Sequence, residues 1–93
     1  MIKYIITVGA NNTTKQVEKL KIEKMLEQNN VQGATLQDTV GYWMGEKEPS
    51  LRIEILDTEN KKNEYIDLCV KFRDELEQQA VLFETASTDA QFI

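Results

Sequence analysis

The residues best suited to contact a ligand are concentrated in segment 41–55. Tyr42 and Trp43 are adjacent, glycines flank them, and Lys47 and Arg52 follow. On neighbouring strand positions the two rings point to opposite faces, so we expect one in the core and the other exposed. An exposed indole beside cationic side chains can stack on a planar anion. The same composition is typical of protein-interface hot spots, so both interpretations stand.

A second candidate is the turn over residues 8–13, where a strand pattern gives way to a helix pattern. Gly9 begins a cluster of helix-breaking residues that includes Asn11 and Asn12, and Thr13 with Gln16 fits a helix capping box. Backbone N–H groups in such a turn can hold a phosphate. A simple helix cap explains the same residues and is the more economical interpretation.

Residue types that carry the common catalytic chemistries are scarce. The chain has no histidine, which excludes imidazole acid–base catalysis and histidine metal ligands. Cys69 lies in an apolar helical stripe, so we expect a buried packing residue and not a nucleophile. The carboxylates show no diagnostic spacing, and no nucleotide, calcium or zinc motif is present. We therefore predict a protein that is not an enzyme and that has no metal site and no cofactor.

Length and charge narrow the possible partners. The 93 residues predict one domain spanning 1–93, and the net charge of −5 argues against binding to nucleic acid polymers or anionic membranes. Residues 1–33 carry a net charge of +2 and residues 34–93 a net charge of −7. An anion would therefore bind near the first strand and helix, unless the lysines there only form a solvated helix face.

The location that the sequence predicts is the cytoplasm. No apolar run approaches the roughly 20 residues of a membrane span. The chain starts directly with a strand pattern, so we expect no signal peptide. A single cysteine cannot form an internal disulfide, which is typical of cytoplasmic proteins.

Hydrophobic periodicity predicts six elements. We expect strands over 2–8, 34–44, 51–56 and 80–86, helices over 13–29 and 60–78, and a polar hairpin turn over 45–49. The order β-α-β-β-α-β predicts an α+β fold of the ferredoxin-like type. Its four-stranded antiparallel sheet would have the order 4-1-3-2, with both helices on one face.

The sheet face opposite the helices predicts self-association. It would carry Ile5, Leu56 and apolar residues of the last strand, which is too apolar for contact with water. The two edge strands could also pair with other chains. We therefore predict a homo-oligomer.

The hairpin resembles that of the PII-like and CutA-like families. The run Tyr42-Trp43-Met44-Gly45-Glu46 leading into 51–56 is similar to the aromatic pair, acidic turn and apolar strand of CutA-like chains, and 79–84 is similar to their last strand. The resemblance implies a trimer with ligand clefts between subunits, where PII-like proteins bind nucleotides. The chain lacks the long PII loop, and it lacks the histidine or exposed cysteine needed for copper, so the ligand does not carry over.

Together these features predict a non-enzymatic oligomer that binds a small anionic, nucleotide-like ligand at inter-subunit clefts. Lysine and arginine would pair with phosphate and the indole would stack on a base. The candidate ligand-binding residues are Lys3, Asn11, Asn12, Lys15, Thr39, Trp43, Lys47 and Arg52. The short chain, rich in Lys, Asn and Glu, resembles phage accessory proteins, which could sequester a nucleotide signal. The alternative is a protein–protein adaptor or inhibitor that uses its acidic surface or aromatic hairpin.

Overall fold

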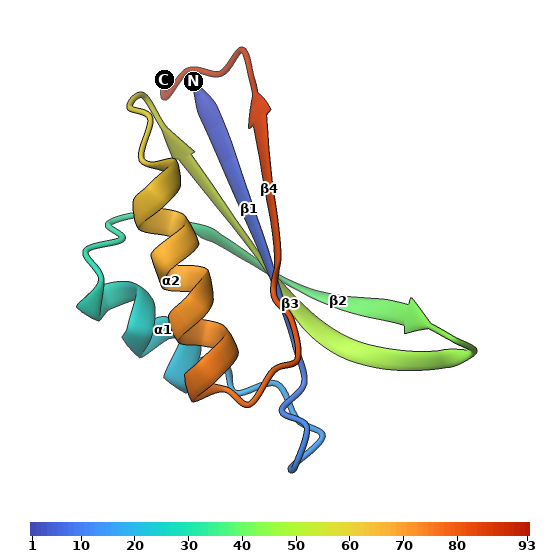
Figure 1. The fold of residues 1–93 in the computed structure, drawn as a ribbon. Helices are drawn as coiled ribbons and strands as arrows, with labels where there is room; N and C mark the ends of the chain where they lie inside the picture. Colours follow the sequence, from blue (N-terminus) through green and yellow to red (C-terminus); the bar gives the residue numbers. More distant parts are fainter.

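The computed structural model describes residues 1–93 and has the predicted order of elements (Figure 1). The elements are β1 (Ile2–Gly9), α1 (Lys19–Gln28), β2 (Thr35–Trp43), β3 (Glu46–Asp57), α2 (Lys62–Glu75) and β4 (Leu82–Ser87). The strands form one antiparallel sheet in the order β2-β3-β1-β4. The α+β, ferredoxin-like architecture and its strand order are confirmed.

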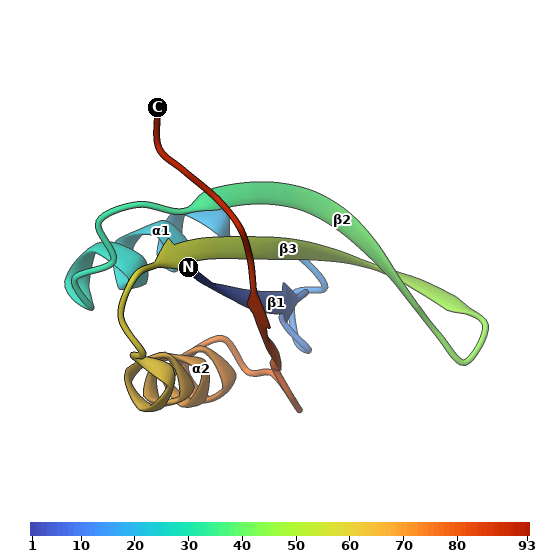
Figure 2. The same cartoon turned by 90° about the horizontal axis from the view of Figure 1, so that it is seen from above.

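Both helices cover the same face of the sheet (Figures 1 and 2). Alternate residues of β1 and β3 point toward the helices, as the twofold periodicity of a strand requires. Apolar residues of α1 and α2 pack against them. The main members of this core are Tyr4, Ile6, Val8, Ile22, Met25, Leu26, Leu51, Ile53, Ile55, Tyr65, Leu68, Phe72 and Leu76.

The opposite face is more polar than the sequence suggested. Ile5 lies there but is only 8% exposed, because it pairs with charged residues on both neighbouring strands. Glu54 forms ion pairs with Lys3 at 3.9 Å and with Arg52 at 3.0 Å. These charged side chains make the centre of the face compatible with water. Neither helix is long and apolar enough to cross a membrane.

The helix α1 begins later than the predicted start at Thr13. The side-chain oxygen of Asn11 accepts hydrogen bonds from the N–H groups of Thr13, at 2.8 Å, and Thr14, at 3.1 Å. Lys15 then adopts φ 63°, in the left-handed region, which a helix cannot include. The capping-box prediction was wrong, because the Gln16 N–H that Thr13 would cap donates to the Thr14 hydroxyl at 3.4 Å, and α1 starts only at Lys19.

The turn of the hairpin is shorter than the predicted 45–49. Trp43 pairs directly with Glu46, so Met44 and Gly45 form a two-residue loop. Both have positive φ, 49° and 84°, as a type I′ turn requires. Pro49 is tolerated in β3 because the pairing with β1 ends at Ser50, so β1 requires no amide hydrogen at residue 49.

Residues 40–49 form a hairpin arm that extends beyond β1 and the helices (Figures 1 and 2). Because no helix lies beneath the arm, Tyr42 is 73% exposed and Trp43 is 75% exposed. The expectation that one of the two rings packs in the core was wrong. Both are available for contacts outside the subunit core.

Tyr4 fixes the connection between β3 and α2. Its hydroxyl accepts a hydrogen bond from the Lys61 N–H at 2.9 Å and donates one to the Glu59 carbonyl at 3.2 Å. Its fully buried ring packs on Tyr65, with 4.5 Å between centroids.

Replacing Tyr4 with Phe should lower the free energy of unfolding by about 1–2 kcal/mol, because two backbone groups lose their partner. Chemical denaturation measures the change. Tyr42→Phe removes the same atom from an exposed ring and should change stability by less than about 0.5 kcal/mol. Equal effects of the two substitutions would contradict this role for Tyr4.

Asp57 holds the other side of the same connection. Its carboxylate accepts hydrogen bonds from the Glu59 N–H at 3.0 Å and the Tyr65 hydroxyl at 3.3 Å, and it pairs with Lys61 at 3.4 Å. The Glu59 amide is the main cause that lowers the pKa of Asp57 below its usual value, with Lys61 and Tyr65 adding to it. The ionised form is therefore favoured in the folded state.

A carboxyl group with a lowered folded-state pKa stabilises the fold above its unfolded pKa, and this contribution is lost as the pH falls through the folded value. Asp57→Asn should therefore cost about 1 kcal/mol at pH 7. The difference from the wild-type protein should shrink below about pH 4. Denaturation at several pH values measures it, and a cost that does not change with pH would contradict the ionic contribution.

Candidate functional site

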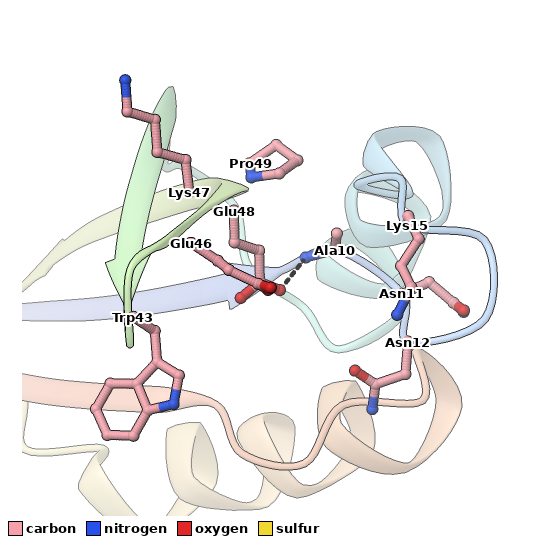
Figure 3. Close-up of a pocket in the computed structure, with 9 residues that line it drawn as sticks. All are labelled: Ala10, Asn11, Asn12, Lys15, Trp43, Glu46, Lys47, Glu48 and Pro49. Atoms are coloured by element: carbon pink, nitrogen blue, oxygen red, sulfur yellow. Dashed lines mark hydrogen bonds between the residues drawn. The ribbon is translucent and has the colours of Figure 1, made fainter.

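A cavity of about 280 Å³ lies between the hairpin arm and the loop after β1 (Figure 3). Ala10 of the loop and Pro49 of the arm line the cavity. Five of the eight predicted ligand-binding residues line it as well. These five are Asn11, Asn12, Lys15, Trp43 and Lys47. The two segments that were singled out separately in the sequence thus meet at one place.

The other three predicted residues lie outside this cavity. Lys3 and Arg52 share the carboxylate of Glu54 on the open sheet face. The Thr39 hydroxyl forms a hydrogen bond with that of Ser50 at 2.7 Å. These side chains are engaged within the sheet and do not line the cavity.

Two carboxylates that showed no diagnostic spacing in the sequence also line the cavity. Glu46 and Glu48 point to the same side of the arm as Trp43, whereas Lys47 extends away from them (Figure 3). The two-residue turn explains this, because it pairs Trp43 with Glu46 and strand periodicity places Glu48 on that face too. Recognising Met44-Gly45 as a type I′ turn would have revealed the cluster from the sequence.

Glu48 is held in place by the backbone. One of its carboxylate oxygens accepts a hydrogen bond from the Ala10 N–H at 3.1 Å (Figure 3). This bond joins the arm to the loop across the cavity. A carboxylate tied at one oxygen keeps further acceptor capacity for a ligand.

Asn11 and Asn12 have different surroundings in spite of their adjacency. Asn11 is 5% exposed; its amide oxygen accepts from Thr13 and Thr14, and its amide nitrogen donates to Glu18 at 3.3 Å. Its polar atoms are thus used to shape the loop. Asn12 is exposed and its side chain makes no hydrogen bond within the protein, which leaves it free at the cavity.

The side of the cavity that carries Trp43, Glu46 and Glu48 favours a cation, while Lys15 lines the cavity from the loop. The face of an indole and nearby carboxylates both attract positive charge. A phosphate in the same position would approach Glu46 and Glu48. Cys69 offers no nucleophile, because it is buried in the core and burial raises the pKa of its thiol to about 11.

Comparison with known proteins gives a match at the level of structure. No family model matches the chain, and no curated protein matches it by sequence. A solved structure of a phage SAM lyase in its apo state superposes with a TM-score of 0.68 at 19% identity. The match covers 91% of this chain and 78% of that one. It shows a shared fold, and the PII-like and CutA-like resemblance likewise holds only for the small antiparallel sheet with two helices.

This match corrects the prediction of a non-enzymatic protein. That phage protein shares the fold and is a lyase, so this architecture is compatible with catalysis. The prediction relied on the missing histidines and on the lack of a nucleophile paired with a base. Those criteria exclude only reactions that need such groups.

Asn11→Ala should lower the free energy of unfolding by about 1–2 kcal/mol, since two loop amides and Glu18 lose their partner. Asn12→Ala, one residue away, should stay within about 0.5 kcal/mol of the wild-type protein. Thermal or chemical denaturation of the pair measures the difference. Equal stabilities would show that the Asn11 side chain does not organise the loop.

Proposed function

We propose that this protein binds S-adenosylmethionine (SAM), or a closely similar adenosyl sulfonium compound, in the cavity and cleaves it as a lyase. The observation that carries the proposal is the placement of Glu46, Glu48 and the Trp43 indole on one side of the cavity. SAM presents a sulfonium, an ammonium and a planar adenine, which carboxylates and an aromatic ring attract. The fold shared with a phage SAM lyase supports the assignment.

The chemistry of a sulfonium fits a chain without histidine. When the carboxylate of SAM attacks the side-chain carbon that carries the sulfur, a carbon–oxygen bond forms as the carbon–sulfur bond breaks. The electron pair stays on sulfur, a neutral thioether departs and a lactone remains. The leaving group therefore needs no proton from a general acid. What the protein must supply is a fixed position for the cation and a reactive geometry for the rest of the molecule.

Exposure of the arm supports the proposal that the protein works as a homo-oligomer. The apolar side chains of the arm are 68% (Val40), 73% (Tyr42), 75% (Trp43) and 85% (Met44) exposed. A neighbouring subunit would cover these apolar groups. The resemblance to PII-like and CutA-like proteins favours a trimer with the ligand between subunits. An exposed arm and a ligand site between subunits are compatible with a phage-type protein that acts on SAM in the cytoplasm.

The test is incubation of the purified protein with SAM. Mass spectrometry would follow the loss of SAM and the appearance of its thioether product. Isothermal titration calorimetry would follow binding, because Trp43 is the only tryptophan and its replacement would remove a fluorescence signal. Glu48→Gln and Trp43→Ala should each weaken binding by about tenfold or more. Glu64→Gln makes the same carboxylate-to-amide change on α2, outside the cavity, and should behave as the wild-type protein.

Turnover that persists unchanged in both cavity variants would place the reaction elsewhere on the protein. A wild-type protein that neither binds nor cleaves SAM would overturn the proposal. That outcome would favour the adaptor alternative, in which the exposed rings of the arm contact another protein.

A further inference from the structure

Gly9, the last residue of β1, leaves room for two side chains that reach across it. A Cβ atom at residue 9 would lie 2.6 Å from Oε1 of Glu48 and 3.1 Å from Oε1 of Gln78. The first distance is too short for any real Cβ contact, so alanine at this position would displace the Glu48 carboxylate. The φ of Gly9 is not positive, so the need for glycine here comes from space and not from backbone conformation.

The neighbouring residue, Ala10, is held at both of its backbone polar atoms. Its N–H donates to Glu48 at 3.1 Å, and its carbonyl accepts from Nε2 of Gln78 at 2.7 Å. The same Nε2 donates to the Leu76 carbonyl at 3.2 Å, which fixes the Gln78 amide against the end of α2. Ala10 itself is only 5% exposed.

A chain of contacts thus runs from the end of α2 to the cavity. Gln78 fixes the Ala10 carbonyl, Ala10 presents its N–H to Glu48, and Gly9 leaves the space that the Glu48 carboxylate occupies. The Asn12 N–H also donates to the Glu77 carbonyl at 3.4 Å, which adds a second link between the two segments. Each step is a direct contact, so displacement at one end has a defined route to the other.

We propose that Gln78 and Gly9 are positioning residues that hold the Glu48 carboxylate in its ligand-facing place. Neither residue touches the ligand, and both act through Glu48. The ligand itself rests on the proposed function, that is, on SAM or a similar cation. The orientation of Glu48 by Ala10, Gln78 and Gly9 does not depend on that identity.

The chain supplies a matched control for each substitution. Gln78→Ala is compared with Gln79→Ala, whose exposed side chain forms no hydrogen bond within the protein. Gly9→Ala is compared with Gly33→Ala, where a Cβ atom would meet nothing within 4 Å. Gln78→Ala and Gly9→Ala should raise the Kd for SAM about tenfold, as loss of an oriented charged group does. The two controls should leave it unchanged.

Coupling to Glu48 separates positioning from general destabilisation. In a Glu48→Ala background, Gln78→Ala should cause no further loss of SAM affinity, because the group through which it acts is gone. The same holds for Gly9→Ala, whose added methyl group no longer meets a carboxylate. If the loss of SAM affinity in each double variant equals the sum of the losses in the two single variants, Gln78 and Gly9 act by another route and the proposal is overturned.

A measurement on the ligand-free protein tests the positioning of Glu48 separately from the proposed binding and cleavage of SAM. Exchange of the Ala10 amide hydrogen with solvent, followed by NMR, should be slow because this N–H donates to Glu48 at 3.1 Å, and Glu48→Ala should make it faster. Gln78→Ala should remove most of this protection, and Gln79→Ala none. If wild-type protein fails to bind SAM but shows this pattern, the proposed function fails and the positioning stands. Protection that is intact in Gln78→Ala would overturn the positioning.

Discussion

The antiparallel pairing of β1 with β3 is the contact on which the rest of the molecule depends. β1 lies between β3 and β4, and its helix-facing residues Tyr4, Ile6 and Val8 are fully buried. The register runs from Ile2 opposite Asp57 to Gly9 opposite Ser50 and then stops. Because β3 continues beyond that point while β1 turns away, a hairpin arm and a loop face each other across a cavity. The site is a direct consequence of two paired strands of unequal length.

The cavity lies where the two differently charged parts of the chain meet. The loop comes from the segment with net charge +2 and the arm from the segment with net charge −7. The orientation of individual side chains decides which charge matters. Lys47 extends away while Glu46 and Glu48 share a side with Trp43, so this side of the cavity is anionic beside an aromatic ring, and Lys15 adds a positive charge from the loop. A net charge summed over a segment of sequence cannot reveal such a division, because alternate residues of a strand face opposite ways.

The sequence was most informative where periodicity is strong and local. The apolar stripe of α2, with Tyr65, Cys69, Phe72 and Leu76, is buried as its spacing indicated. Predictions failed where a single side chain or a φ angle decides the outcome. Asn11 binds the Thr13 and Thr14 amides in a turn where a helix was expected to start, and positive φ at Met44 allows a tighter turn than composition suggested. Met is an uncommon residue at such a φ, so the turn gave a weak signal.

The sequence by itself determined the order of elements, the strand order and two of the segments that line the cavity, because hydrophobic patterning and short connections leave few topologies. It also determined that no imidazole chemistry is possible. Only the tertiary structure decided that loop and arm meet, that Glu48 is tied to Ala10, and that Gln78 at the other end of the chain contributes to the same place. The reason is physical. These contacts join residues 38 and 68 positions apart, and their geometry depends on where β1 stops relative to β3, which no local pattern encodes.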